Sequence, residues 1–412
     1  MVLPVRIRLW HLLHLTNKII PTYKQSLVTK NQTIMINNLK QQKINRPAGL
    51  KDADNNKPQY DMIVFCHLRW QFVYQRPQHI ISRMAQTMRI LFVEEPIHDT
   101  QNTNSGNLIM VSDNLHVLQP NVRDIASITD IISAYVPQKN IPVGWFYSAS
   151  FCPLLDYFEF DTIVYDCMDE LSLFKGAPEQ LINQEKYLMA NADIIFTGGK
   201  SLYESKKQFH SNVHCFPSSV EESHFAKALN GIIVPDDISY LAYPIVGYYG
   251  VIDERIDLEL LRDTALQLPH VSFVMIGPLA KIHESELPRA DNLHYLGMKS
   301  YDELPNYLKA FDIAMMPFAL NDATKYISPT KTLEYMAARK PIISTRIIDV
   351  VRDYDHCVSL IENAEEFTNA VTFLCDDTDR TDMENDYVTI LEKTSWDSTA
   401  REMKAIIKLF AK

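Results

Sequence analysis

Short runs of apolar residues recur along the chain from Tyr60 onward, and turn-forming residues separate them. The runs are rich in β-branched and aromatic side chains, which is typical of strands, and apolar residues at helical spacing lie between several of them. Because the runs are nearly continuous instead of alternating with polar residues, they predict a parallel sheet with both faces covered. The strands expected in the first half of the chain are residues 62–66, 89–93, 116–120, 142–146, 162–166, 193–197 and 213–216. The helices expected between them are residues 76–87, 124–136, 179–190 and 200–208.

The pattern weakens over residues 220–243, which contain Pro235 followed by two aspartates, and then begins again. We interpret this interruption as a connection between two domains. The second series of strands is expected at residues 244–250, 271–277, 292–297, 312–318, 340–345 and 357–361. Its helices are expected at residues 257–267, 301–310, 329–338, 363–375 and 396–410. The expected fold class is therefore α/β, with two doubly wound, Rossmann-like domains that bind ligands at the carboxyl ends of their strands.

The predicted organisation has four parts. A basic, flexible leader covers residues 1–58, and the two Rossmann-like domains cover residues 59–225 and 226–395. The last helix lies within residues 396–412, and one option is that it crosses back to the first domain. Two such domains that face each other leave a cleft between them, which is a common place for a small-molecule site.

The leader differs from the rest of the chain in its charge. Residues 1–50 contain eight Lys or Arg and no acidic residue, whereas the whole chain of 412 residues has a net charge of −11. The apolar and basic start, residues 5–15, suits contact with an anionic membrane surface. The alternatives are a signal peptide, a disordered extension and a start codon assigned too early. An acidic body is a poor partner for nucleic acid, because binding the phosphates of nucleic acid needs a basic face.

Composition narrows the class of protein further. No apolar run approaches the roughly 18 residues that a membrane-spanning helix needs. The six cysteines are scattered without a C-x-x-C pair, which favours reduced thiols in a cytosolic chain over disulfides or a zinc site. We find neither of the glycine-rich phosphate motifs, G-x-x-x-x-G-K-[ST] or G-x-G-x-x-G. The expected location is cytoplasmic, with peripheral contact at the inner face of the membrane as an option.

The segment SPTKTLEYMAARKPIIST (residues 328–345) carries the most informative candidate chemistry. Ser328 is expected to cap a helix that starts with the following proline, so that Thr330 and Lys331 lie in its first turn. The free backbone N–H groups of a first turn, together with a lysine, form a site for an anion. Glu334 lies one turn further on the same face, where its carboxylate could accept hydrogen bonds from the two hydroxyls of a ribose. An ordinary capped helix with a Lys–Glu pair is the alternative.

The segment VGYYGVIDERIDLELL (residues 246–261) adds a second candidate on the same domain. Gly247 and Gly250 close a predicted strand and let the backbone approach a ligand. Arg255 follows at the turn between strand and helix, a position that suits phosphate binding. The alternative is a surface arginine paired with one of the two acidic residues that precede it.

Two further groups lie at strand ends of the first domain. Asp166 and Asp169 follow the strand at residues 162–166, where they could act as a general base, contact a hydroxyl or ligate a metal. We favour hydroxyl binding, because no further carboxylate pair is spaced to complete a metal site, and a helix cap is the alternative for Asp169. The segment FCHLRWQFVYQRPQHI, at the end of the first strand, gathers the polar and aromatic residues His67, Arg69, Trp70, Gln75, Arg76 and Gln78.

Together these blocks resemble a GT-B glycosyltransferase of the large retaining family 4, the group 1 type. The resemblance extends from about Tyr60 to the C-terminus. It rests on the order and spacing of HLRWQFVYQRPQH, YDCMDELSLFKGAP, ADIIFTGGKSLYE with FPSSVEESHF, GYYGVIDERIDLELL and SPTKTLEYMAARKPIIST. It implies two Rossmann-like domains around a central cleft, with a nucleoside diphosphate sugar on the C-terminal domain and the acceptor on the N-terminal one.

The resemblance also implies roles for single residues. It assigns the ribose to Glu334 and the diphosphate to Arg255 and Lys331. The first Glu of the family's Glu-x7-Glu motif is replaced here by Tyr326, and the resemblance implies that Lys331 takes over part of the role of that Glu. The full set of donor-side residues is Glu334, Arg255, Lys331, Thr330, Gly250 and Tyr326. The acceptor-side residues are Arg69, Trp70, Arg76, Gln78 and Asp166, and the residues expected to take part in catalysis are Asp169, His67 and Lys331.

The expected activity is transfer of a sugar, of the hexosyl type, from a nucleoside diphosphate sugar to a hydroxyl of a glycan or lipid-linked glycan. The resemblance implies retention at the sugar carbon, a role in polysaccharide biosynthesis, and no metal or cofactor besides the donor. Two alternatives stay open. A nucleotide-sugar 2-epimerase of the same fold would change the sugar without an acceptor, and a non-catalytic module would bind the nucleotide or sugar and release no diphosphate.

Overall fold

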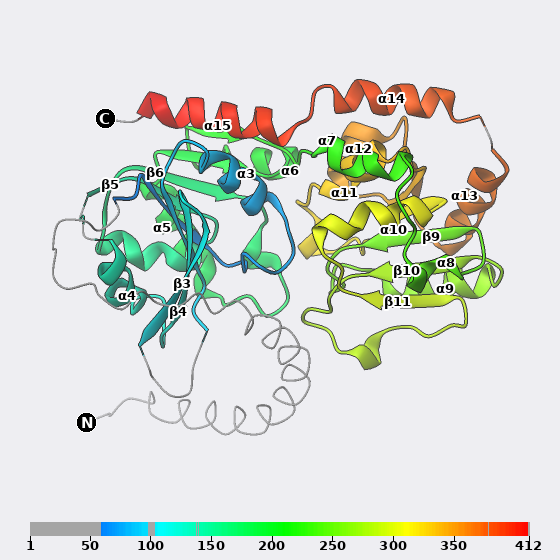
Figure 1. The fold of residues 1–412 in the computed structure, drawn as a ribbon, viewed down its shortest axis with the longest axis horizontal. Helices are drawn as coiled ribbons and strands as arrows, with labels where there is room; N and C mark the ends of the chain where they lie inside the picture. The colour runs from blue at the N-terminus through cyan, green and yellow to red at the C-terminus, as the bar shows by residue number, and fades with distance from the viewer. Residues whose placement is uncertain (1–58, 98–103, 137, 139, 378, 411–412) are drawn as a thin grey trace, which may run out of the picture. The chain divides into compact units, whose positions relative to one another are not determined.

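The computed structural model describes residues 59–97, 104–136, 138, 140–377 and 379–410. The leader expected at residues 1–58 lies outside the described residues. Two sheets, parallel except for one edge strand and each accompanied by helices, form the described chain (Figure 1). We call the sheet β1–β8 with its helices the first lobe, and the sheet β9–β14 with its helices the second lobe. No helix of the described residues is both long and apolar enough to span a bilayer.

The first sheet has eight strands in the order β3-β4-β2-β1-β5-β6-β7-β8. All neighbours run parallel except β3, which pairs antiparallel with β4 at the edge. The strands are β1 (Met62–Cys66), β2 (Ile90–Glu94), β3 (Ser105–Ser112), β4 (Leu115–Asn121), β5 (Asn140–Phe146), β6 (Glu159–Cys167), β7 (Ile194–Thr197) and β8 (Val213–Cys215). The α-helices of this part are α3 (Arg76–Met84), α4 (Ile128–Tyr135), α5 (Gln180–Asn191) and α6 (Lys200–Lys206). Short 3-10 helices are η2 (Ala149–Asp156) and η3 (Leu171–Leu173).

The central strand β1 shows why the apolar runs are continuous. Ile63 and Phe65 pack into the core on one face of the sheet, whereas Met62, Val64 and Cys66 pack into the core on the other. All five side chains are fully buried. The prediction of a parallel sheet covered on both faces is therefore confirmed.

The second sheet has six parallel strands in the order β11-β10-β9-β12-β13-β14. They are β9 (Ile245–Tyr249), β10 (Ser272–Ile276), β11 (Leu293–Gly297), β12 (Ile313–Met316), β13 (Ile342–Thr345) and β14 (Ser359–Ile361). The helices associated with it are α9 (Leu258–Gln267), α10 (Leu304–Ala310), α11 (Thr330–Ala337), α12 (Ile348–Tyr354), α13 (Ala364–Asp376) and α14 (Thr381–Leu391). Short elements are α7 (Glu222–Phe225), η4 (Ala226–Leu229), α8 (Asp236–Ser239), η5 (Glu284–Glu286), η6 (Tyr301–Glu303) and η7 (Asp322–Thr324).

The strand β9 corrects one sequence expectation. A Cβ atom at Gly247 would lie 2.2 Å from the ring of Phe311, so this glycine makes room for a core side chain. It is not a point where the backbone approaches a ligand. The absence of a side chain at Gly247 therefore serves the packing of the second lobe.

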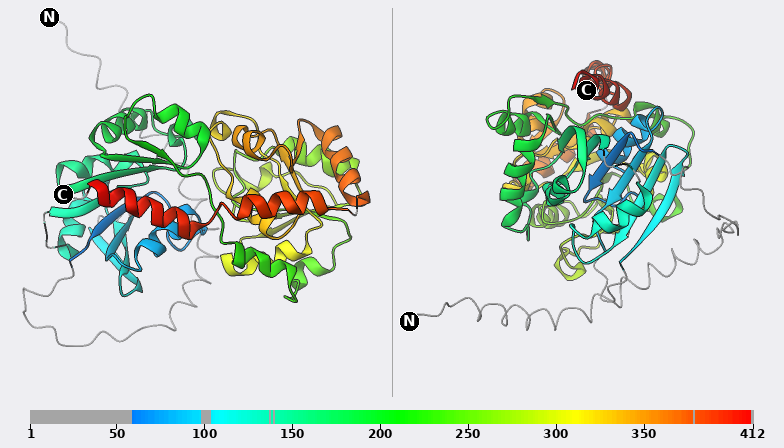
Figure 2. Two further views of the ribbon diagram at one scale, coloured as in Figure 1. Left: turned by 90° about the horizontal axis from the view of Figure 1, so that it is seen from above. Right: turned by 90° about the vertical axis from the view of Figure 1, so that its left-hand side faces the viewer.

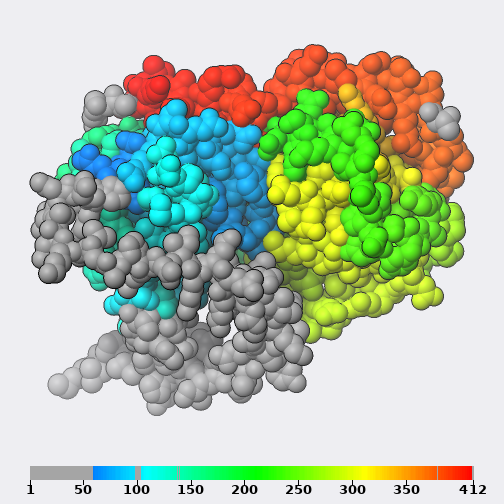
Figure 3. Space-filling model, viewed as in Figure 1, coloured from blue at the N-terminus to red at the C-terminus, as the bar shows by residue number. Residues whose placement is uncertain are grey.

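The last helix, α15 (Trp396–Phe410), packs on the first lobe. Trp396, Ala400, Met403 and Ile407 belong to the same buried cluster as β1, and α15 contacts α3. In Figure 2 the chain passes from α14 on the second lobe directly to α15, and in Figure 3 the atoms of α15 lie against those of the first lobe. The chain thus connects the two lobes twice, before α7 and before α15.

Candidate functional site

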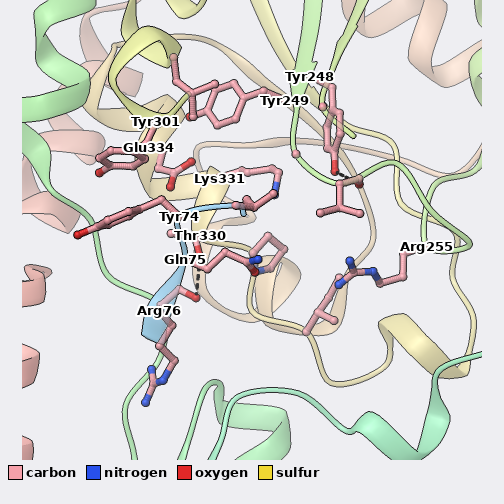
Figure 4. A pocket seen from close by; sticks show the side chains of 18 of the residues that line it. Tyr74, Gln75, Arg76, Tyr248, Tyr249, Arg255, Tyr301, Thr330, Lys331 and Glu334 are labelled. Carbon is pink, nitrogen blue, oxygen red and sulfur yellow. Dashed lines mark hydrogen bonds between the residues drawn. The ribbon is translucent and has the colours of Figure 1, made fainter. Parts of the chain in front are cut away.

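A pocket lies where the carboxyl ends of strands from both sheets meet. The first lobe contributes the β1–α3 loop, the end of β6 and the end of β7. The second lobe contributes the residues after β9 and β10, the segment around η6, and the N-terminal turn of α11. Figure 4 shows the charged and aromatic side chains of this pocket. The predicted site residues among those that line it are Gln75, Arg76, Asp169, Gly250, Arg255, Thr330, Lys331 and Glu334.

Lys331 lies in the first turn of α11 and lines the second-lobe side of the pocket. Its ammonium lies 5.5 Å from the centre of the Tyr248 ring. Within the described residues no carboxylate lies within 4.0 Å of it. Burial lowers the pKa of Lys331, although the nearby Glu334 acts in the opposite direction. A half-buried lysine with no ion-pair partner among the described residues is well suited to bind an anionic ligand.

The Lys331 side chain leaves no room for a side chain at residue 250, which is a glycine. Its backbone has φ +143°, a region that side chains rarely tolerate, and a Cβ atom there would lie 2.3 Å from Cε of Lys331. Gly250 therefore lets the lysine side chain lie across the end of β9.

The start of α11 differs from the sequence expectation. Pro329, not Ser328, is the N-cap residue, and no side chain caps the helix. The Ser328 carbonyl instead accepts a hydrogen bond of 2.6 Å from the Ser218 hydroxyl, while Thr330 Oγ1 donates to Ser218 Oγ over 3.3 Å. The prediction that Ser328 caps the helix is therefore wrong. The Thr332 N–H donates to the Pro329 carbonyl over 3.3 Å, whereas the N–H groups of Thr330 and Lys331 have no backbone acceptor among the described residues. These two N–H groups are therefore available to a ligand.

Glu334 lies one turn deeper in the same helix and is only 8 % exposed. Burial raises its pKa, and Lys331 opposes the shift. The hydroxyl of Tyr249, also at the pocket wall, is buried and makes no hydrogen bond within the part of the chain that is described. Burial first, and then the Glu334 carboxylate, raises the pKa of Tyr249. A carboxylate beside an unsatisfied hydroxyl offers both an acceptor and a donor to the hydroxyls of a ligand.

Arg255 lines the pocket but already has a partner. Its Nε and Nη2 donate to the carboxylate of Asp253 over 2.7–3.1 Å, and its guanidinium lies 5.3 Å from the ring centre of Phe174 of the first lobe. Burial lowers its pKa, but the hydrogen bonds and charge of Asp253 raise it more. Arg255 is thus paired with a preceding acidic residue, as the alternative to phosphate binding predicted. It nevertheless lines the pocket.

Asp169 is the carboxylate that the first lobe presents to the pocket. Burial raises its pKa to about 6, although Arg255 lowers it. No hydrogen bond to its side chain is found among the described residues, whereas Glu170 next to it pairs with the buried Lys206 over 2.7 Å. The loop is therefore held by the neighbouring residue, and the Asp169 carboxylate is left free for a ligand.

Three residues expected to contact an acceptor have partners within the protein instead. Asp166 is fully buried and accepts hydrogen bonds of 2.9–3.2 Å from the guanidinium of Arg76. Arg76 also donates to the Phe216 carbonyl over 2.7 Å, and in Figure 4 its side chain points away from Lys331. Gln78 is 1 % exposed. Asp166 and Gln78 do not line the pocket, and Arg76 lines it with a guanidinium that is already satisfied.

Gln78, Arg69 and Trp70 shape the β1–α3 loop (residues 67–75). The Gln78 amide donates to the carbonyls of Arg69, Trp70 and Val73 over 3.1–3.3 Å. The buried Glu94 accepts hydrogen bonds from Arg69 Nη1 at 3.0 Å and from the Trp70 N–H at 2.8 Å. Arg69 and Trp70 lie outside the pocket lining, so the structure gives them a supporting position in place of the expected direct contact.

His67 and Tyr326 also lie outside the pocket lining. His67 Nδ1 is buried without a hydrogen-bond partner among the described residues, and burial lowers the pKa of this histidine to about 4. Tyr326 packs against the core of the first lobe. The residue in place of the family's first Glu therefore contributes to packing between the lobes and does not face the pocket.

The pocket lining also includes three aromatic side chains that were not expected at the site, Tyr74, Tyr249 and Tyr301. Tyr74 lies in the segment at residues 65–80 that was singled out for other residues. Tyr301 had no such signal. No group of three or more His, Cys, Asp or Glu that could hold a metal ion occurs among the residues the structure describes.

Comparison with known proteins finds glycosyltransferases. Residues 243–377 match the family model "Glycosyl transferases group 1". A curated relative, "Putative teichuronic acid biosynthesis glycosyltransferase TuaH" of Bacillus subtilis (strain 168), is 23% identical over 224 residues. The match covers 49% of this chain and 55% of that protein, so the chain spans about half the length of the relative.

Solved structures share the fold over most of this chain. Sucrose-phosphate synthase from Thermosynechococcus elongatus is 15% identical, with a TM-score of 0.65 over 84% of this chain and 98% of that one. A second structure, "Trehalose-6-phosphate from E. coli bound with UDP-2-fluoro glucose", is 10% identical, with a TM-score of 0.64 over 84% of this chain and 98% of that one. Anabaena Alr3699/HepE in complex with UDP and glucose is 12% identical, with a TM-score of 0.62 over 85% of this chain and 100% of that one. The protein therefore has the α/β GT-B fold, and its second lobe carries a region that matches the group 1 glycosyl transferases.

Proposed function

We propose that the protein is a glycosyltransferase that moves a sugar from a nucleoside diphosphate sugar to an acceptor hydroxyl. The observation that carries the proposal is the wall formed by α11. Lys331 and the first-turn amides offer positive charge to a diphosphate, and Glu334, one turn deeper, offers a carboxylate to a ribose. The match of residues 243–377 to the group 1 glycosyl transferases supports the proposal, because these residues include that wall.

The chemistry follows from where charge develops. Departure of the nucleoside diphosphate places negative charge on its phosphate oxygens, beside Lys331 and the start of α11, and preorganised positive groups stabilise that charge. We propose retention, with the acceptor hydroxyl attacking on the side of the leaving group and passing its proton to a phosphate oxygen. No metal is assigned to the reaction. Asp169, on the opposite wall, orients a hydroxyl of the sugar or the acceptor.

The proposed acceptor is a glycan or a lipid-linked glycan, and the proposed product belongs to a surface polysaccharide. The name of the Bacillus relative, which refers to teichuronic acid biosynthesis, supports this class of acceptor. We further propose a cytoplasmic enzyme of the hexosyl-transferring type that contacts the inner face of the membrane through residues 1–58. Eight basic and no acidic side chains in the first 50 residues support the last point.

One observation favours a second candidate, a non-catalytic nucleotide-binding module. Tyr326 takes the place of the family's first Glu and packs against the first lobe instead of facing the pocket. A protein that lacks this carboxylate could bind the nucleotide and do no chemistry. Asp169 is a second carboxylate at the pocket, which is why we place transferase activity first.

Sugar transfer can be measured as acceptor-dependent release of nucleoside diphosphate from UDP-, GDP-, dTDP- and ADP-sugars. We expect release with one of these donors and a glycan or glycolipid acceptor, and a loss of about 100-fold in kcat for Lys331→Met. Lys325→Met, which changes an exposed lysine nearby, is the matched control and should leave kcat unchanged. Nucleotide binding without release with any acceptor would instead establish the binding module. Conversion of the sugar without an acceptor would establish an epimerase.

A further inference from the structure

The pocket ends in aromatic side chains on the far side of Glu334 from the phosphate-binding groups. Figure 4 shows Arg255, Lys331 and Glu334 in turn across the pocket, with Tyr301 and Tyr74 beyond them. A nucleoside diphosphate has its phosphates, ribose and base in that same order. With phosphates at Lys331 and the ribose at Glu334, the planar base therefore reaches the tyrosines.

Tyr301, in η6, has both faces of its ring covered. On one face the ring of His224 is nearly parallel to it, with ring centres 4.2 Å apart and an angle of 6° between the planes. On the other face is Tyr74, with ring centres 4.6 Å apart and an angle of 28°. A planar ligand that stacks on Tyr301 must therefore take the place of one of these two rings.

The two covering rings differ in how firmly they are held. His224 is 5 % exposed, and its Nε2 lies 3.0 Å from the Tyr301 carbonyl, so it is a fixed part of the wall behind Tyr301. Tyr74 is half-buried, comes from the β1–α3 loop of the other lobe and meets the His79 ring edge-on, with ring centres 4.6 Å apart. No hydrogen bond between Tyr74 and Tyr301 is found among the described residues. The backbone of that loop is held by Gln78, so rotation of the Tyr74 side chain or a small movement of the lobes uncovers Tyr301. A ligand can therefore reach the Tyr301 face under Tyr74 without disrupting the packing of His224 behind the ring.

We propose that Tyr74 is a removable cover for the base-stacking face of Tyr301. Binding of a nucleoside diphosphate exchanges the Tyr74–Tyr301 stack for a stack between Tyr301 and the base. The inference rests on the proposed function, since it takes a nucleotide as the ligand. It makes Tyr74 a residue of the first lobe that sets the affinity of a ligand bound mainly by the second lobe.

The sign and size of the effect follow from this exchange. A covering ring must be displaced before the base can stack, so its removal should increase affinity. Stacked aromatic pairs contribute an amount that corresponds to about 2- to 10-fold in a binding constant. A ligand without a base, such as inorganic pyrophosphate, reaches Lys331 without displacing Tyr74, and its affinity should not change.

The test is isothermal titration calorimetry of the full chain, which measures the dissociation constants of UDP, GDP, dTDP, ADP and pyrophosphate. The variants are Tyr74→Ala and Tyr74→Phe, with Tyr157→Ala as a control that changes an exposed tyrosine outside the pocket lining. We expect Tyr74→Ala to bind the preferred nucleoside diphosphate about 2- to 10-fold more tightly, with pyrophosphate unchanged. Tyr74→Phe, which keeps the ring, and the control should match the wild type.

Several results would overturn the inference. Unchanged or weaker nucleotide binding by Tyr74→Ala would show that Tyr74 does not compete with the base, and an equal gain for pyrophosphate would show that the effect is not one of stacking. If Tyr74→Ala does not fold, Tyr74→Leu keeps an apolar side chain without a ring and carries the same expectation. A wild-type protein that binds no nucleoside diphosphate would overturn the proposed function itself, together with this inference.

Discussion

Replacement of Asp169 by Asn should stabilise the protein at alkaline pH while it impairs turnover. Burial raises the pKa of Asp169 from 3.8 to about 6, so the folded protein holds this proton more tightly than the unfolded chain. The stability that the protonated Asp169 carboxyl contributes to the folded state is fully present below pH 3.8, and it is lost as the pH rises through about 6. A difference of about 2 pKa units corresponds to about 3 kcal/mol at 1.36 kcal/mol per unit. Because the side chain is partly exposed, we expect a gain of about 1–3 kcal/mol for the neutral Asn at pH 8.

The assay is urea denaturation of wild type and Asp169→Asn between pH 4 and pH 8, together with kcat for sugar transfer. The free energy of unfolding should favour the variant at pH 8, and the difference should shrink toward pH 4. The wild-type kcat should rise with pH through about 6 as the carboxylate ionises, whereas the variant should be slow throughout. Asp291→Asn, at an exposed turn, is the control and should change neither quantity. A stability difference that does not depend on pH would refute the argument that the buried charge is its cause.

Three further predictions concern binding. Glu334→Gln should weaken nucleoside diphosphate binding by about 1–3 kcal/mol and leave pyrophosphate unaffected, because the charge-assisted hydrogen bonds go to the ribose; exposed Glu365→Gln is the control in the same titration. Lys331→Met and Arg255→Met should each weaken binding of a nucleoside diphosphate more than that of the parent nucleoside, and an equal loss for both ligands would mark these residues as structural. Removal of residues 1–58 should reduce salt-sensitive binding to anionic vesicles and spare turnover of a soluble acceptor; vesicle binding that persists would place the membrane contact on the folded lobes.

Most of the fold could be predicted because buried parallel strands have continuous apolar sequences. The edge strand β3 (Ser105–Ser112) was missed for the converse reason. It lies at the edge of the sheet with mostly exposed or half-buried residues, so its sequence lacks such a run. The helices α12 (Ile348–Tyr354) and α14 (Thr381–Leu391) were also missed, since each has only two fully buried side chains and shows little helical periodicity.

The candidate site was predictable where its residues are close in sequence. Lys331 and Glu334 are one helical turn apart, so their common face follows from the spacing alone. The contacts of Arg76 with Asp166 join residues 90 positions apart and depend on how the strands are ordered in the sheet. Sequence reasoning therefore took both residues for ligand contacts, although they satisfy each other.

The aromatic end of the pocket had no signature in the sequence. Tyr74 and Tyr301 belong to different lobes, and neither lies in a motif that indicates stacking. Tyr326 shows that a position in a motif does not determine where the side chain points. Its place in the motif suggested a contact with the donor, but its direction is set by packing against the first lobe.

A crystal structure of the protein with the nucleoside diphosphate that it binds most tightly would test the central claim most directly. We predict phosphate oxygens within hydrogen-bond distance of Lys331 Nζ and of the first-turn N–H groups of α11, with the ribose hydroxyls on the Glu334 carboxylate. A nucleotide bound at the strand ends of the first sheet, with Lys331 and Glu334 both unengaged, would contradict the account.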